Sequence, residues 1–442
     1  MRKLGIVTIL VLASACQHYA PAPLTHAIPL RPAAAVLAET PAGALTVGDV
    51  VRLALADDPD LVAARAKRGV AQGQWLQSGL LPNPSLSGAF LPLLSGVGTV
   101  PAWTAGLSQD VKALITYRSR RRAGRDAAAQ VYADLLWQEW QVAGQARQLA
   151  LDLIETQHMR PVAAEAYTIL RDRNAAVDAA LAAGNTTLVV AAPSRLAFQT
   201  ARANLNGVDQ RILTLRHQLN ALLGLVPDAA LTLVPTVDMP PLDIAAARAS
   251  IATLPDRRPD LLALRLGYAA QEEVVRQAIL SQFPDLVLGG AASSDNSRVI
   301  NAGPNVSIGL PIFDRNQGNI AIAQATREQL RGEYAARLAS TAGEVGAALT
   351  EIEQFAGQLA VARRDLPAAR LAAARAAAAR GASAIDEAAF VDLITTRFSK
   401  EQDVMALELA LQDRQVAVET LLGLGLPSVD TLPDVADRGA RR

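Results

Sequence analysis

The chain has 442 residues, 42 Lys and Arg against 42 Asp and Glu, one cysteine, and 51% hydrophobic but only 4% aromatic residues. A lone cysteine excludes a disulfide framework and a cysteine-based metal cluster, and the even charge balance gives no global basic excess for nucleic acid. Few aromatics and long alanine-rich runs favour extended helices packed through small residues. Beyond the N-terminal region, no apolar run is long enough for a conventional transmembrane helix.

The N-terminus has the pattern of an export signal. A basic start, Met1-Arg2-Lys3, is followed by the apolar run Leu4 to Leu12 and then by Ala13-Ser14-Ala15-Cys16. The last segment resembles a bacterial lipobox. We therefore expect residues 1–15 to be a signal peptide and Cys16 to be lipidated, with ordinary signal-peptide cleavage as the alternative. Gln17 after the cysteine is typical of sorting to the outer membrane.

The chain contains one internal repeat. Asp58-Pro59-Asp60-Leu61 is followed about two hundred residues later by Arg258-Pro259-Asp260-Leu261, and further landmarks keep nearly the same offset. Each copy predicts a helix N-terminus, because proline in the first turn and an acidic neighbour suit one. The expected organisation is a tether over 16–44, a first repeat over 45–230, a second over 245–427, and a tail over 428–442.

Each repeat also predicts one strand hairpin. Residues alternate between apolar and small or polar in four segments, the two-residue period of a strand with unlike faces. The segments are Ser85–Leu91, Ala102–Gln109, Leu286–Ala292 and Asn305–Ile312. Four strands cannot close a membrane barrel, because the smallest known kind has about eight. Either several chains share one barrel, or the strands form a small soluble sheet that caps the helices.

Very long helices are expected after each hairpin. Residues 118–183 and 319–380 contain one proline each, Pro161 and Pro367, and such helices are on the order of 100 Å long. Turns near Gly184 and Gly381 lead into returning helices, which makes two antiparallel helical hairpins. We hypothesise that the two prolines bend the long helices toward their closed tips.

Parts of the sequence resemble a known protein family. Two segments are similar to the outer-membrane efflux proteins of the TolC family. One is the opening Leu45-Thr46-Val47, followed by Asp58-Pro59-Asp60-Leu61. The other is the junction Gly303 to Ile320, with its core Phe313-Asp314-Arg315-Asn316-Gln317. The likeness covers about residues 45–427 and is greatest to the heavy-metal efflux branch of the CzcC kind.

The resemblance implies a mainly α fold with a small transmembrane β part. Three chains would form a 12-stranded β-barrel in the outer membrane and an α-helical tunnel across the periplasm. The tunnel would dock on a periplasmic adaptor (membrane fusion protein) and an inner-membrane RND pump, and would export heavy-metal cations. Multidrug efflux, a type I secretion duct, and a non-conducting periplasmic adaptor or structural coiled coil are the alternatives.

The two tips are the candidate sites. We expect adaptor contact or a periplasmic gate at two sets of turn residues: Gly184, Asn185 and Thr186, and Gly381, Ser383, Asp386 and Glu387. Ordinary exposed turns are the alternative. Six nearby charges could form rings in a trimer. They are Arg171, Asp172, Arg173, Asp178, Arg380 and Asp386.

No enzymatic site is predicted. His18, His26, His158 and His217 include no pair at ligand spacing, and no phosphate loop or nucleophile motif occurs. We therefore expect no metal site, no cofactor and no catalysis in this chain.

Overall fold

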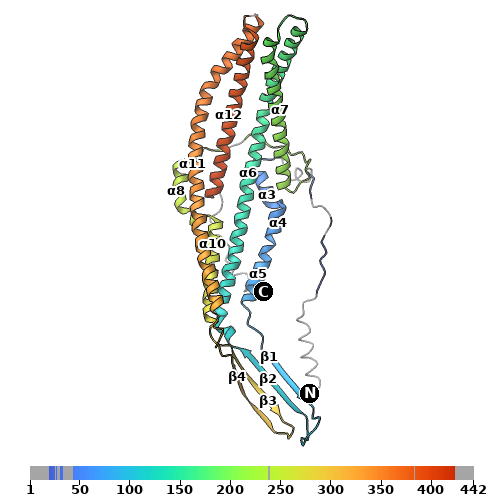
Figure 1. Ribbon diagram of the computed structural model, residues 1–442, viewed down its shortest axis with the longest axis vertical. Helices are drawn as coiled ribbons and strands as arrows, with labels where there is room; N and C mark the ends of the chain where they lie inside the picture. The colour runs from blue at the N-terminus through green and yellow to red at the C-terminus, as the bar shows by residue number, and fades with distance from the viewer. Residues whose placement is uncertain are drawn as a thin grey trace.

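The computed structural model describes residues 19–24, 26, 30–32, 43–236, 239–382 and 384–423. The predicted signal peptide 1–15, Cys16, Ser383 and the tail 428–442 lie outside the described residues. The described chain is long and narrow, with a strand sheet at one end and the turns of two helical hairpins at the other (Figure 1).

The elements occur in the same order twice. The first half has α3 (Val47–Asp57), α4 (Pro59–Arg65), α5 (Lys67–Ser78), β1 (Ser85–Leu91), β2 (Ala102–Asp110), α6 (Lys112–Ala182) and α7 (Leu188–Leu222). The second has α8 (Ile244–Ser250), η1 (Ile251–Thr253), α9 (Leu254–Arg257), α10 (Pro259–Leu280), β3 (Leu286–Ser294), β4 (Ile300–Ile308), α11 (Gln317–Gly381) and α12 (Glu387–Leu422). This order confirms the predicted fold class, in which each repeat is one β-hairpin plus one long helical hairpin.

In each half a helix begins at the repeated motif, α4 in the first and α10 in the second, but its start is stabilised differently. Asp58 caps α4 by accepting a hydrogen bond from the Leu61 amide at 2.7 Å. In α10 the equivalent Arg258 has no such oxygen. It is buried, ion-paired to Asp260 at 2.7 Å, and its guanidinium lies 4.3 Å from the centre of the Trp137 ring of α6. The second copy of the motif thus connects α10 to α6.

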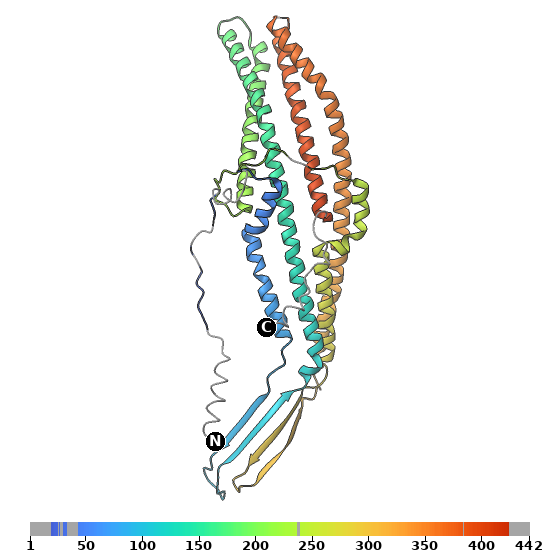
Figure 2. The same cartoon turned by 180° about the vertical axis from the view of Figure 1, so that it is seen from behind.

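The long helices form two unequal hairpins. α6 has 71 residues and α7 has 35, while α11 has 65 and α12 has 36. At about 1.5 Å per residue, α6 is roughly 105 Å long and its returning partner covers only half of it. The other half of α6 lies beside α5 and α10, and that of α11 lies beside α10 (Figure 2). Each long helix therefore has a neighbour along its whole length.

Buried side chains form three main clusters along this body. One lies where α3, the middle of α6 and the end of α7 meet, and includes Leu45, Val50, Leu153, Leu215 and Leu219. A second, with Leu254, Leu261, Leu349, Val418 and Leu422, occupies the corresponding place in the second repeat. The third joins the two hairpins nearer their tips. It contains five alanines beside Leu170, Phe390, Val391, Ile394 and Phe398, as expected for helices that approach closely.

Both predicted helix prolines lie inside continuous helices. Pro161 is within α6 and Pro367 within α11. Each removes one backbone hydrogen bond and its ring crowds the preceding turn, which favours bending. Pro193, in the first turns of α7, is a third helix proline that the sequence reasoning did not single out.

One strand boundary differs from the prediction. The expected strand Asn305–Ile312 is displaced, because β4 runs from Ile300 to Ile308. The Gly309 amide donates to the Asp285 carbonyl at 2.9 Å, and this bond closes the end of the sheet. Pro311 then has no amide to donate, so the apolar alternation of residues 309–312 continues outside any strand.

Gly423 generates the first prediction. It ends α12 with φ of 71°, and a Cβ added there would collide with the ring of Trp140. Gly423→Ala combines left-handed strain with overpacking, so we expect a loss of about 2–4 kcal/mol of unfolding free energy. Thermal unfolding of the purified protein in detergent measures it.

Gly357→Ala is the matched control. This glycine lies inside α11 with open space around its Cα, so the alanine should raise stability by up to about 1 kcal/mol. Equal melting temperatures for the two variants would contradict the packing described.

Candidate functional site: the strand sheet and the tips of the helices

The sheet has one apolar and one polar face. Its four strands pair antiparallel in the order β1-β2-β3-β4, and the register places Leu86 opposite Leu107 and Phe90 opposite Trp103. The same face carries Leu288, Ile300, Val306 and Ile308. The other face carries Ser85, Ser87, Thr104, Ser108, Ser293, Asn301, Asn305 and Ser307. Most large apolar side chains thus lie on one side and most small polar ones on the other, with Leu91 and Val287 as the large apolar residues of the polar face.

No described helix covers the apolar face. All seven residues of β1 and all nine of β4 are exposed, and the side of the sheet with Leu86, Phe90 and Ile300 stands open. Asp110, at the helix end of β2, is the one charged residue in the four strands. A sheet with this much open apolar surface needs an apolar environment or a partner.

Both edges of the sheet are also unpaired in the described chain. β1 pairs only with β2, and β4 only with β3. Pro304 lies in β4 opposite Gly290, a position that an edge strand tolerates because proline has no amide to donate. β2, β3 and β4 each have nine residues, which is the length of a strand that crosses a bilayer.

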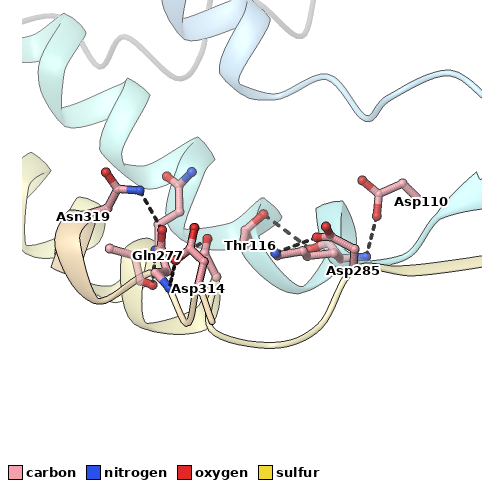
Figure 3. Close-up of polar contacts among 10 residues, drawn as sticks. Asp110, Thr116, Gln277, Asp285, Asp314 and Asn319 are labelled. Atoms are coloured by element: carbon pink, nitrogen blue, oxygen red, sulfur yellow. Dashed lines mark hydrogen bonds and ion pairs between the residues drawn. The ribbon is translucent and has the colours of Figure 1, made fainter. Parts of the chain in front are cut away.

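A polar junction connects the sheet to the helices (Figure 3). The Asp110 carboxylate accepts from the Lys112 amide at 2.8 Å, and the Lys112 ammonium pairs with Asp285 at 2.7 Å. On the other side Asn316 adopts φ of 61°, which asparagine tolerates better than most residues, and donates to the Ala278 carbonyl at 2.7 Å. Asn316, which belongs to the segment with the family resemblance, therefore holds the start of α11 against the end of α10.

The first tip is a tight turn built around Gly184. Its φ of 72° is left-handed, and the following Asn185 amide donates back to the Ala180 carbonyl at 2.9 Å. Asn185 is exposed and Thr186 partly so. In the second tip, Gly381 is the last residue of α11 and Asp386 caps α12 by accepting from the Ala389 amide at 2.8 Å. The predicted turn residues of both tips that the structure describes, apart from Glu387, thus lie at or beside the surface.

Glu387 is different, because its carboxylate is buried between three helices. Its side chain is only 6% exposed, and both of its oxygens accept from Arg173 of α6, at 2.8 and 2.9 Å. Arg380 of α11 adds a third contact at 3.1 Å. Bidentate pairs of this kind fix orientation as well as charge. Two of the six predicted gate charges therefore meet at Glu387 and connect the two hairpins.

The other predicted gate charges are also satisfied within the chain. Asp178 of α6 pairs with Arg195 of α7 at 2.7 Å, and this hydrogen bond lowers the pKa of the Asp178 carboxyl. Asp172 pairs with its neighbour Arg171 at 2.7 Å. The Asp178–Arg195 pair connects α6 to α7, whereas Arg171 and Asp172 are exposed neighbours on α6.

One tip feature escaped the sequence reasoning. Leu188, Val189 and Val190 open α7 directly after the first turn, and all three are exposed. The signal was available, since an apolar triplet follows Thr186-Thr187. Exposed apolar residues at a helix tip favour contact with another protein.

A second missed feature is a carboxylate pair between α6 and α12. Asp152 and Asp413 face each other, and each has a buried Oδ1 without a hydrogen-bond partner among the described residues. Arg211 of α7 pairs with the other oxygen of Asp152 at 3.0 Å. Burial, reinforced by the charge of Asp152, raises the pKa of Asp413 to about 7. Asp413 therefore keeps its proton to a higher pH than an ordinary aspartate does.

The described residues bear on two further kinds of site. They contain no group of three or more His, Cys, Asp or Glu side chains placed to hold a metal ion. Within the same ranges, every helix is too short or too polar to traverse a bilayer.

Glu387 yields a stability prediction. Glu387→Gln removes the charge that two arginines share in a mostly buried place, so we expect a loss of about 2–3 kcal/mol in unfolding free energy. Thermal unfolding at neutral pH measures it. Glu328→Gln is the control, because Glu328 is exposed and its arginine contacts are 3.6 and 4.0 Å long. It should change stability by less than about 0.5 kcal/mol, and an equal loss in both variants would contradict the role given to Glu387.

Asp413 yields a pH prediction. Its folded pKa of about 7 lies above the ordinary aspartate value of 3.8, so the folded chain keeps a proton that the unfolded chain releases. This contribution to stability is complete below about pH 4 and is lost as the pH rises through 7. Asp413→Asn keeps the neutral state, and should raise the melting temperature at pH 8 relative to wild type with little change at pH 4.5. A variant that is destabilised equally at both pH values would refute the raised pKa of Asp413.

Comparison with known proteins agrees with this architecture. Residues 251–424 match the family described as outer membrane efflux protein. The cobalt-zinc-cadmium resistance protein CzcC of Cupriavidus metallidurans is 25% identical over 308 residues, which cover 67% of this chain and 70% of that protein.

Solved channels share the fold. A CusC structure superposes with a TM-score of 0.68 at 19% identity and covers 91% of this chain and 99% of its own. The open-state MtrE outer membrane channel of Neisseria gonorrhoeae gives 0.68 at 17% identity, covering 86% and 89%. With the two-faced sheet and the paired helical hairpins, these likenesses place residues 251–424 in the outer membrane efflux protein family and give the described chain the fold of the solved channels.

Proposed function

We propose that this chain is the outer-membrane exit duct of a tripartite efflux system of the RND type. The observation that carries the proposal is the sheet, with one apolar face, one polar face and two unpaired edges. In hydrocarbon, every backbone amide and carbonyl needs a partner inside the protein. Copies joined edge to edge satisfy this demand, with lipid against the apolar face and water against the polar one.

Three copies are the proposed assembly. Two copies would supply eight strands, the minimum for a membrane barrel, and three supply twelve. Three also follows the family plan, and it makes a tunnel of helices from the hairpins that continue each sheet. The match of residues 251–424 to a channel family supports this plan. The repeat units 45–230 and 245–427 are proposed as the two halves that each copy contributes.

The helical tips are the proposed docking end. A periplasmic adaptor would contact Asn185 and Thr186 of the first turn together with the exposed Leu188, Val189 and Val190. Gly184 shapes that turn. Gly381, Ser383 and Asp386 are the proposed contacts on the second tip. The Arg173–Glu387–Arg380 cluster lies just behind them and is proposed to hold the tip in its described conformation.

The proposed cell location follows from family and N-terminus together. The family belongs to the outer membrane, and the helices extend from the sheet in the direction of the periplasm. Lipidation of Cys16 would anchor the N-terminus in that membrane, with residues 16–44 as the tether. Mass spectrometry of the mature N-terminal peptide distinguishes a lipidated Cys16 from simple cleavage after Ala15.

Heavy-metal cations are the proposed cargo. The support is the likeness to a cobalt-zinc-cadmium resistance protein. A polar lumen lined by serine, threonine and asparagine hydroxyl and amide groups passes hydrated ions without binding them tightly. Selection among metals would then lie with the inner-membrane pump.

Face-specific substitution tests the membrane assignment of the sheet. Leu107→Arg puts a charge on the apolar face, which costs about 2–4 kcal/mol near the middle of a bilayer. We expect loss of the assembled oligomer from outer-membrane fractions. Ser108→Arg, one residue along and on the polar face, should still assemble and should alter channel conductance. Assembly of both variants at wild-type level would contradict the assigned orientation.

Deletion of the gene tests the cargo. We expect lower tolerance to Co, Zn or Cd salts, restored by the wild-type gene, with unchanged tolerance to a panel of hydrophobic drugs. Unchanged metal tolerance with increased drug sensitivity would replace metal by drug export, and a defect only in a secreted protein would indicate a type I secretion duct.

A further inference from the structure

The exposed side chains of α6 change from apolar to basic over its first four turns. Leu114 and Ile115, nearest the sheet, are 50% and 40% exposed. Tyr117 follows, and then come four exposed arginines in three turns. They are Arg118, Arg121, Arg122 and Arg125. Away from the sheet, the order is therefore apolar, aromatic, basic.

Helix geometry places these side chains on one surface. Leu114, Arg118, Arg121 and Arg125 are spaced by three or four residues, so they project from the same side of α6. Side chains in a helix lean toward its N-terminus, and the N-terminus of α6 is the end joined to the sheet. The arginines therefore lean toward the membrane boundary, with Arg118 about 12 Å along the helix from the last residue of β2.

Trp75 of α5 completes a hollow on this surface. Together with Tyr117 and the four arginines it encloses an open space of about 420 Å³ between α5 and α6. The two helices can approach closely here because Gly124 of α6 lies directly against Ser78 and Trp75. The hollow is thus framed by helix packing and lined by cations and two aromatic rings.

The arginines of the hollow are poorly neutralised by the chain itself. Arg118 and Arg121 form no hydrogen bond or ion pair with any residue that the structure describes. Arg122 lies 3.6 Å from Glu273, which is held more tightly by Arg276 at 2.7 Å. Arg125 pairs with the adjacent Asp126 at 2.7 Å.

Their neighbour Arg120, by contrast, is hydrogen-bonded within the chain. It donates to the carbonyls of Ser78 at 3.0 Å and Leu80 at 2.6 Å, which ties α6 to the segment leading into β1. Arg120 therefore has a structural role, whereas Arg118 and Arg121 leave their guanidinium groups available to a ligand.

We propose that this hollow binds the phosphate headgroup of an anionic phospholipid at the periplasmic surface of the outer membrane. The assignment rests on the proposed membrane orientation of the sheet. Tyrosine and tryptophan favour the level of the headgroups, and arginine forms paired hydrogen bonds to phosphate oxygens. The apolar Leu114 and Ile115 lie on the side of the hollow where the acyl chains begin. The site would fix the depth and tilt of each copy in the membrane.

Competitive lipid binding tests the proposal. The full-length assembly is purified, exchanged into mixed micelles with equal phosphatidylglycerol and phosphatidylcholine, and analysed by native mass spectrometry for retained lipid. One basic side chain at an anionic lipid surface contributes about fivefold in affinity. We therefore expect selective retention of phosphatidylglycerol by the wild type and roughly a 30-fold loss in the double variant Arg118→Gln/Arg121→Gln.

Arg202→Gln/Arg375→Gln is the matched control. These exposed arginines, on α7 and α11, likewise have no ion-pair partner among the described residues, and the variant removes the same charge far from the sheet. It should retain phosphatidylglycerol as the wild type does. Equal losses in both variants would indicate a nonspecific charge effect and overturn the site.

Two further outcomes would also overturn it. Displacement of the lipid by an equal concentration of inorganic phosphate would show a site for free anions. Unchanged lipid retention in Arg118→Gln/Arg121→Gln, with a shift of its reversal potential in a salt gradient, would place the arginines in the tunnel. Conductance of the wild type in a planar bilayer separates these results from failure of the proposed channel function.

Discussion

The main constraint on the proposed assembly is that both edges of the four-stranded sheet need hydrogen-bonding partners. An exposed edge is a row of backbone donors and acceptors, and in lipid each one left unmatched costs several kcal/mol. Because β1 and β4 lie at opposite edges, the sheet of one copy offers complementary surfaces to the next. The separation of apolar and polar side chains onto opposite faces then determines which side of such an assembly meets lipid.

The helices obey a related constraint, since no long helix in the described chain buries its surface alone. α6 and α11 run nearly the full length of the body, and shorter helices meet end to end beside them (Figure 1). At these meeting points the chain concentrates its largest buried leucines and the Arg258–Asp260 pair beneath Trp137. Toward the tips, alanines and the Glu387 cluster replace that core. The hairpins are therefore held firmly at mid-length and by a few polar contacts at the end where docking is proposed.

Much of this architecture was predictable, because its signals are local. Prolines at helix starts, the two-residue period of the strands and the repeated Pro-Asp-Leu motif each depend on neighbouring residues. What escaped prediction depends on contacts between distant segments. Glu387 looked like an exposed turn residue, yet Arg173, more than two hundred residues earlier, buries it. The Asp152–Asp413 pair has no sequence signature at all. The end of β4 was misplaced because apolar alternation continued past Gly309, where backbone pairing with Asp285 had already closed the sheet.

Several copies of the chain are proposed to close one conducting barrel from these sheets. The most direct test combines native mass spectrometry of the detergent-purified, full-length protein with single-channel recording of the same sample in a planar bilayer. The account predicts a complex of three chains and stable, stepwise conductance. A folded monomer that stays soluble without detergent and gives no conductance would contradict it.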